Sequence, residues 1–153
     1  MPSILNRIGA LTWVAMLSGV ATPLHALVFL TEENPPFNYA ASGKAAGIST
    51  EIVTEMARRA GIPAQFSVMK WEEAYQRAQA DKDVCVYSIA RLENRENQLR
   101  WVGELVREAP LWLACNPRVG KDDIAKLASA LAAMNKDGSR KRLLDALEKR
   151  SSP

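Results

Sequence analysis

Residues 27–39 have the sequence LVFLTEENPPFNY, a short apolar run followed by a polar segment with two consecutive prolines. A run that is apolar at every position is typical of a strand buried on both faces, as in a parallel sheet covered by helices. Proline fixes its own backbone angle and lacks an amide hydrogen, so Pro35 and Pro36 exclude both a helix and a paired strand. We therefore predict a buried strand over 27–30 and a loop after it.

The chain beyond this loop alternates between helical and extended patterns. Apolar residues from position 48 to 57 recur at helical spacing, which predicts a helix that Ser49 or Thr50 caps and Gly61 ends. Such alternation favours a three-layer α/β fold, an open and mostly parallel sheet flanked by helices. The remaining predictions are a turn over 42–44, strands over 65–69, 84–89, 99–106 and 111–115, a helix over 71–79, a loop or single helical turn over 91–97, and two tail helices capped by Asp122 or Asp123 and by Ser139.

Residues 1–26 have the order of charges and apolar residues that a secretory signal peptide requires. Arg7 and the amino terminus supply positive charge, residues 8–21 are mostly apolar, and Pro23 precedes the small residue Ala26. A buried helix or a membrane anchor is the alternative, but a spanning helix needs about 20 apolar residues, more than this run contains. We therefore predict a cleaved leader over 1–26, a periplasmic mature chain over 27–153, and no stable membrane insertion after cleavage.

The charge balance excludes several classes of partner. The chain carries 20 basic and 17 acidic side chains, a net charge of +3, and most of its basic residues are dispersed. A balance so close to zero predicts no nucleic-acid binding and no strong adhesion to anionic membranes. The basic triplet at 140–142 is interpreted as a solvated helix face rather than as a binding patch. With one histidine and no clustered cysteine pair, the sequence also predicts no metal site and no cofactor.

Cys85 and Cys115 each lie in an apolar run, at 84–87 and 111–115. An exported protein permits a disulfide. The bond requires Cα atoms within about 7 Å of each other, which spacing along the chain does not show. We interpret the pair as two small buried thiols, with a disulfide as the alternative.

The loops that follow the predicted strands carry side chains suited to a small zwitterion or organic acid. In open α/β sheets, ligands collect at the carboxyl ends of the strands. Aromatic rings offer flat apolar contact, and the planar guanidinium of arginine matches a carboxylate. The alternatives are core packing for the aromatics and surface ion pairs with Glu93 and Glu96 for the arginines. The predicted ligand-binding residues are Glu32, Phe37, Tyr39, Trp71, Arg91 and Arg95.

Several motifs follow the leader in a fixed order. They are LTEENPPFNY at 30–39, GI at 47–48, EIV at 51–53, KWEEA at 70–74, SIARLENRE at 88–96 and WVG at 101–103. In this order and spacing the sequence resembles the bacterial extracellular solute-binding proteins of family 3, which include the polar amino-acid receptors of ABC importers. The resemblance covers most of residues 27–103, and the tail is similar to the family's closing segment. It implies the fold of a type II periplasmic binding protein and a small polar solute as ligand.

The resemblance also implies roles for single residues. Phe37, with Tyr39 as a second aromatic, would stack on the ligand, and Arg95 would clamp its carboxylate. Arg91 and Trp71 belong to a subgroup pattern whose ligands are less well defined.

Two features depart from the family pattern. The amino-acid receptors usually carry Ser or Thr shortly before the clamp arginine, where this chain has Ala90, so the class of small carboxylate stays open. Family members also have two lobes, whereas this chain passes from residue 103 almost directly to the closing segment. We expect a single lobe built from 27–103 and 109–153, with the second lobe missing. Half a cleft predicts weak binding, or binding that an ABC permease or another protein chain completes.

These observations predict a non-catalytic periplasmic solute-binding protein of the kind that serves ABC transporters. One alternative is an interaction or relic protein that uses the former cleft face. Another is a small-carboxylate dehydratase, with Glu32 or Glu93 as general acid beside Arg95. A working acid–base group needs an enclosed site, which one lobe does not offer.

Overall fold

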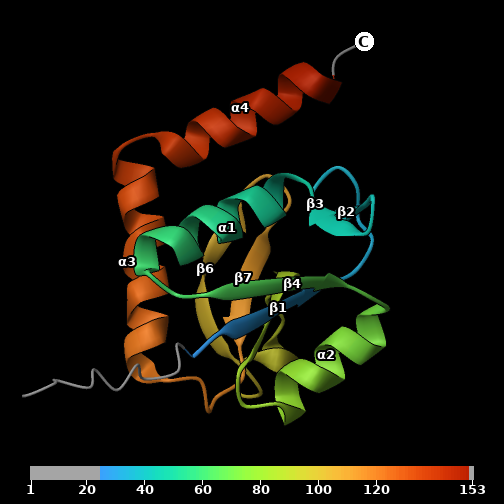
Figure 1. Ribbon diagram of the computed structural model, residues 1–153, viewed down its shortest axis with the longest axis vertical. Coiled ribbons are helices and arrows are strands. Elements are labelled where there is room, and N and C mark those ends of the chain that lie inside the picture. Colours follow the sequence, from blue (N-terminus) through green and yellow to red (C-terminus); the bar gives the residue numbers. More distant parts are fainter. Residues whose placement is uncertain (1–24, 152–153) are drawn as a thin grey trace, which may run out of the picture.

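A five-stranded sheet forms the centre of the computed structural model, which describes residues 25–151 (Figure 1). Its strands are β1 (Leu27–Thr31), β4 (Ala64–Val68), β5 (Val84–Ala90), β6 (Arg100–Val106) and β7 (Leu111–Cys115). They lie in the order β4-β1-β5-β7-β6. Strand β1 is parallel to β4 and β5, whereas β7 is antiparallel to both of its neighbours. Four of the five strands therefore point the same way, as the predicted mostly parallel sheet requires.

Helices cover both faces of this sheet. They are α1 (Ile48–Ala60), α2 (Trp71–Ala80), α3 (Lys121–Lys136) and α4 (Ser139–Ser151), with the single turn η1 at Glu93–Arg95. Helices α1 and α3 pack together on one face, and α2 packs on β1 and β5 from the other. Helix α4 turns away from the end of α3 and runs across the molecule beside α1 (Figure 1). The predicted three-layer α/β fold is confirmed.

The sheet separates two apolar cores because successive strand residues point to opposite faces. Phe29 and Tyr87 belong to the core under α1 and α3, and Leu30 and Val86 belong to the core under α2. All four side chains are fully buried. Burial of one large apolar side chain contributes about 1.5–3 kcal/mol, so the two cores are the main source of stability.

A small hairpin between β1 and α1 was not predicted. Its strands are β2 (Tyr39–Ala41) and β3 (Lys44–Ala46), joined by Ser42 and Gly43 with φ angles of 50° and 76°. Two central residues with positive φ match the twist of a tight hairpin, so the predicted turn is present. The strands are only 3 residues each, too short for a periodic pattern.

Gly47 joins this hairpin to α1 in a conformation that other residues rarely adopt. Its φ is 104°, and a Cβ atom at this position would overlap the carbonyl group of Phe37. That carbonyl oxygen accepts a hydrogen bond of 2.8 Å from the amide of Ser49. The loop that carries Phe37 is therefore fixed against the start of α1.

The predicted amino-terminal caps of the first long helix and the first tail helix are wrong. Helix α1 begins at Ile48, and Ser49 and Thr50 are buried in its first turn. The Thr50 hydroxyl instead shares a hydrogen bond of 2.8 Å with the Tyr87 hydroxyl. Helix α3 follows Gly120, without a side-chain cap. These backbone starts are set by packing on the sheet, which outweighs the roughly 1 kcal/mol of a capping hydroxyl.

The interpretation of the cysteines as two free thiols is wrong. Cys85 and Cys115 form a disulfide with an S–S length of 2.04 Å. The two residues are direct cross-strand partners in the antiparallel β5–β7 pair. The sequence did not show this because the pairing depends on the register of two strands separated by β6 and its turns.

The interpretation of the triplet at 140–142 as a solvated helix face is wrong for Arg140. Its side chain is 9% exposed, and Nε donates a hydrogen bond of 2.9 Å to the carbonyl oxygen of Leu105. Lys141 and Arg142 are exposed, as predicted. Arg140 therefore connects α4 to the end of β6 instead of facing solvent.

The predicted leader lies outside the described residues except for His25 and Ala26. Strand β1 begins at Leu27, directly after the predicted cleavage point. Over residues 25–151, no helix is both long and apolar enough to cross a bilayer. The same residues contain no cluster of three or more potential metal ligands of the His, Cys, Asp or Glu type.

We expect loss of the disulfide to lower the free energy of unfolding by about 3–4 kcal/mol, because the bond closes a long loop in the unfolded chain. Its partners are 30 positions apart. Urea unfolding of the oxidised protein and of the Cys85→Ala/Cys115→Ala variant measures the difference. Reductant should shift the midpoint of the parent chain and leave that of the variant unchanged. Equal midpoints for the two proteins would contradict a stabilising bond.

We expect stability to fall between pH 10 and pH 12 through Tyr87. Burial raises the pKa of the Tyr87 phenol from 10.0 to about 12, although its hydrogen bond to Thr50 acts in the opposite direction. The folded state retains the proton while the unfolded state loses it, so about 2–3 kcal/mol of stability is present below pH 10 and lost as the pH rises to 12. Absorbance at 295 nm should show a late tyrosinate step that Tyr87→Phe removes. A step near pH 10 for every tyrosine would disprove the assignment.

Candidate functional site

The carboxyl ends of β1, β5 and β6 lie along one edge of the sheet. Ala90 and Val106 are both paired with Leu111, so β5 and β6 end in the same row. Strand β1 runs parallel to β5 and ends at Thr31. The loops that leave this edge carry the predicted ligand-binding residues. The structure distributes these residues over separate clusters.

Trp71 and Arg95 are brought into contact at this edge. Trp71 is the first residue of α2, and its ring stacks on Tyr75 with centroids 5.4 Å apart. The guanidinium carbon of Arg95 lies 5.1 Å from the Trp71 centroid and 5.2 Å from that of Tyr75. Nη1 of Arg95 donates to the carbonyl oxygen of Ala90 at 3.2 Å. The aromatic pair and the end of β5 thus hold this cation in one place.

Arg95 has no carboxylate partner in the part of the chain that the structure describes. Its side chain is half-buried, so the guanidinium is still reached by solvent. A guanidinium presents five N–H donors, and one hydrogen bond to a carbonyl leaves most of them for a ligand. The surface ion pair that was the alternative for Arg95 is therefore not formed.

Glu32 lies in a shallow hollow on the other side of Trp71. The hollow measures about 360 Å³ and is also lined by Lys70. Glu32 itself is half-buried. Glu33 and Glu72 line the same hollow, so three carboxylates face one ammonium group, and this part of the edge suits the cationic end of a zwitterion.

Arg91 is engaged within the protein. Its guanidinium carbon lies 5.3 Å from the Trp101 centroid and 4.8 Å from that of Trp112. Nε donates to Oε2 of Glu96 at 2.9 Å, and Nη2 makes a second bond to Oε1. These bonds hold the pKa of the Glu96 carboxyl below its usual value. The ion-pair alternative is thus confirmed for Arg91, and two tryptophans that sequence reasoning did not assign to the site surround it.

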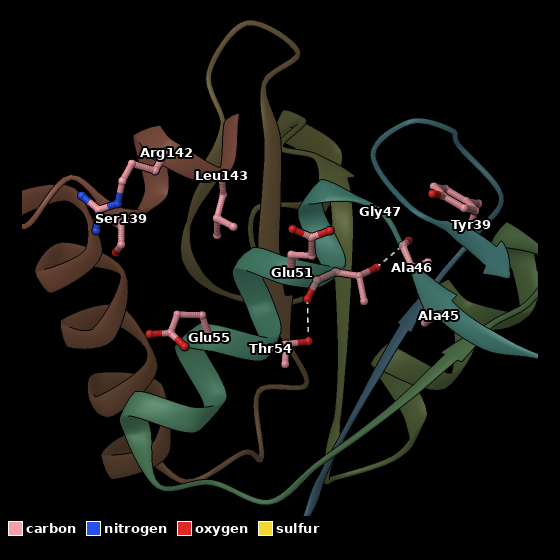
Figure 2. Close-up of a pocket in the computed structure, with 11 residues that line it drawn as sticks. Tyr39, Ala45, Ala46, Gly47, Glu51, Thr54, Glu55, Ser139, Arg142 and Leu143 are labelled. Atoms are coloured by element: carbon pink, nitrogen blue, oxygen red, sulfur yellow. Dashed lines mark hydrogen bonds between the residues drawn. The ribbon is translucent and has the colours of Figure 1, made fainter. Parts of the chain in front are cut away.

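Phe37 and Tyr39 line two other hollows. Phe37 packs against the core under α1 and α3 and faces a hollow of about 480 Å³ with Val106 and Leu144. Tyr39 lines a groove of about 670 Å³ between the β2–β3 hairpin, α1 and α4 (Figure 2). The predicted set is therefore divided: Glu32, Trp71 and Arg95 adjoin, Arg91 has its own partners, and the two aromatics of the first loop lie elsewhere.

Thr54 and Glu55, two polar residues of the Tyr39 groove, are bound within the protein. The Thr54 hydroxyl donates to the Thr50 carbonyl oxygen at 2.7 Å, as the close-up shows (Figure 2). Glu55 accepts hydrogen bonds from Arg58 and Arg59, and these bonds lower the pKa of its carboxyl to about 2. Arg142 also lines this groove, and its exposed guanidinium donates one hydrogen bond of 3.1 Å to the Asp137 carbonyl oxygen.

Ser88 is a further residue near the edge that sequence reasoning missed. Its φ of 59° is unusual for a residue with a side chain, and it lies where the β5–β7 register shifts. Its hydroxyl is buried without a hydrogen-bond partner among residues 25–151. No pattern in the sequence signals this conformation, because it arises from the pairing of two distant strands.

Comparisons with known proteins agree on a fold and a family. The family model described as bacterial extracellular solute-binding proteins, family 3, matches residues 27–146. No curated protein matches the chain.

Several solved structures share the fold at low sequence identity. A periplasmic His/Glu/Gln/Arg/opine family-binding protein from Silicibacter pomeroyi in complex with lysine has a TM-score of 0.72 at 9% identity, over 84% of this chain and 99% of that chain. The arginine-bound form of domain 1 from TmArgBP has a TM-score of 0.61 at 18% identity, over 71% of this chain and 91% of that one. The ancestral amino acid-binding protein AncCDT-1, a precursor of cyclohexadienyl dehydratase, has a TM-score of 0.68 at 12% identity, over 80% and 95%.

We expect the two arginines to differ in their effect on stability. Arg95→Ala should cost no more than about 1 kcal/mol, because it removes an exposed contact with aromatic rings and one hydrogen bond. Arg91→Ala should cost more, because Glu96, Trp101 and Trp112 all lose a partner. Chemical unfolding of both variants measures the order. A larger loss of stability for Arg95→Ala than for Arg91→Ala would contradict this prediction and show that the contacts of Arg95 contribute more to folding.

Proposed function

Because the chain belongs to the bacterial extracellular solute-binding proteins of family 3, we propose that it binds a small amino-acid-like carboxylate at the carboxyl edge of its sheet. Arg95 receives the carboxylate, and Trp71 gives flat apolar contact to the rest of the solute. The acidic hollow beside Trp71, which Glu32 lines, attracts the cationic group of such a solute. The protein then acts as a binding module for transport and not as a catalyst.

The observation that carries this proposal is the state of Arg95. A cation fixed on two stacked rings and on the Ala90 carbonyl oxygen is held in position before a ligand arrives. Pre-organisation reduces the entropy lost on binding. Because no carboxylate of the described chain pairs with Arg95, a solute carboxylate has no internal competitor there. Two parallel N–H···O bonds from one guanidinium match the planar geometry of a carboxylate.

We further propose that the chain functions as a single lobe, over 27–103 and 109–153. The arginine-bound form of domain 1 from TmArgBP supports this, because by its description one domain of that protein holds a ligand. An open edge gives the solute fewer contacts than a closed cleft, so the affinity is expected to be low. An ABC permease or a second protein chain that covers the edge would raise it.

Export to the periplasm is part of the same proposal. It rests on the leader predicted over 1–26 and on a family whose members are extracellular. The disulfide in β5–β7 suits an oxidising compartment.

A dehydratase is the weaker alternative. Glu93 is exposed in η1, and Glu32 lies in an open hollow, so neither has the dry surroundings that tune a general acid. The neighbouring AncCDT-1 is itself described as an amino acid-binding protein.

Titration calorimetry against a panel of amino acids and small organic acids tests the proposal. We expect at least one carboxylate to bind, and Arg95→Ala to weaken it by about tenfold or more, as for loss of a charged hydrogen-bonding partner. Trp71→Leu should weaken it less, because Tyr75 and the Ala90 carbonyl oxygen still hold the guanidinium that receives the carboxylate.

The matched control is Arg77→Ala. Arg77 lies on α2, and its Nε is 3.1 Å from Oδ2 of Asp81. The substitution removes the same charge as Arg95→Ala, at a position away from the sheet edge. The Arg77→Ala variant should bind the carboxylate with the same affinity as the parent chain. If Arg77→Ala weakened binding as much as Arg95→Ala, the loss of affinity would be an effect of net charge and not of a contact at Arg95. Silence across the whole panel would instead favour an interaction protein that uses this face.

A further inference from the structure

Arg140 is a buried cation whose hydrogen bonds go to uncharged oxygen atoms. It lies in the first turn of α4 and is 9% exposed. Besides the bond from Nε to the Leu105 carbonyl oxygen, Nη1 donates to Oδ1 of Asn135 at 3.0 Å. No Asp or Glu side chain of the described residues forms an ion pair with it. Burial accordingly lowers the pKa of its guanidinium. The carboxylates of Glu104 and Glu108 attract this guanidinium without forming an ion pair with it, so most of the cost of burying the charge is not offset and this position calls for an explanation.

A hollow of about 480 Å³ opens beside this guanidinium. It lies between α4, the end of α3 and the turn from β6 to β7. Phe37, Val106 and Leu144 give it an apolar wall. Arg140 also lines a neighbouring hollow of about 360 Å³. The volume is within the range of about 300–1,000 Å³ that small-molecule sites occupy.

The other charged groups around the hollow are paired with each other or exposed. Lys141 lies 2.7 Å from Asp145, and Arg107 lies 3.6 Å from Glu104. Glu108 is an exposed turn residue that lines the hollow. Its carboxylate is a competitor for Arg140 from within the chain. Two acidic side chains at the rim would also repel a dianion such as phosphate.

We propose that this hollow is a second ligand site, which takes the carboxylate of an amphipathic monocarboxylic acid on Arg140 and its apolar body on Phe37, Val106 and Leu144. The internal bonds use the Nε hydrogen and one Nη1 hydrogen, so Nη2 and the second hydrogen of Nη1 remain to receive one carboxylate. The apolar wall gives the body of the ligand a place out of water, at about 25 cal/mol for each Å² buried.

This site is separate from the one at Arg95. Both adjoin the carboxyl edge of the sheet, but Arg95 rests on the α2 side with Trp71 and Tyr75. Arg140 and Phe37 belong to the opposite side, with α3 and α4. Occupation of the second site does not depend on the proposed function of the first.

The test uses 3-phenylpropionate as the probe and its neutral amide, 3-phenylpropionamide, as the comparison. Titration of the isotope-labelled chain, followed by amide chemical shifts, locates binding without any variant. We expect the acid to shift signals of residues 37, 106, 135 and 144, and the amide to bind at least tenfold more weakly. Shifts confined to residues 71–95, or none at millimolar probe, would overturn the proposal while leaving the Arg95 site to its own test.

Arg140→Lys keeps the charge and removes the fork, so it should weaken the acid by about tenfold or more; because it also removes the bonds to Leu105 and Asn135, the amide spectrum of the variant is first checked for the folded state. Arg142→Lys is the matched control, since Arg142 is exposed on the same helix, and it should leave the affinity unchanged. Glu108→Gln removes the internal competitor and should tighten binding severalfold. Equal affinity in the parent and Arg140→Lys proteins would overturn the assignment of the carboxylate to Arg140.

Discussion

The burial of β5 is the constraint on which the other features of the structure depend. Six of its seven residues are buried, and the strand pairs with β1 on one side and β7 on the other. Tyr87 at its centre accepts a hydrogen bond from Thr31 of β1 and shares one with Thr50 of α1. Cys85 is bonded covalently to β7. With both faces and both edges of β5 occupied, the position of Ala90 at its end is fixed, and Arg95 is anchored to that residue.

Arg91 and Arg95 show how the same side chain acquires different functions one helical turn apart. The segment that leaves β5 makes the single turn η1, which directs Arg91 to β6 and β7 and Arg95 to α2. Glu96 is within reach of Arg91 and neutralises it. Arg95 meets only π-faces and a carbonyl oxygen, groups that stabilise a cation without cancelling its charge. The availability of Arg95 is therefore a consequence of where one short turn lies.

The parts of the fold that the sequence predicted are those that local patterns encode. The long helices and the five main strands have apolar residues at helical or strand spacing, and their predicted bounds agree with the structure within a few residues. The disulfide, the register shift at Ser88 and the burial of Arg140 depend on contacts between segments far apart in the chain. No local window contains that information. The candidate site divides in the same way: sequence identified Trp71 and Arg95, but their contact depends on α2 and η1 being neighbours across the sheet edge.

The guanidiniums of Arg95 and Arg140 place different demands on a ligand because their surroundings differ. Arg95 remains partly hydrated, so a ligand there exchanges water for charged hydrogen bonds with a net gain of about 1.5–3 kcal/mol, and an open edge leaves most of a polar solute in solvent. Arg140 has already lost its hydration, since folding buried it. A carboxylate that reaches it adds a direct ion pair at a partly buried position, where the attraction is stronger than at the surface. The larger part of the desolvation cost at Arg140 is borne by folding and not by binding. The same sheet edge can therefore favour a hydrophilic solute on its α2 side and an amphipathic acid on its α4 side.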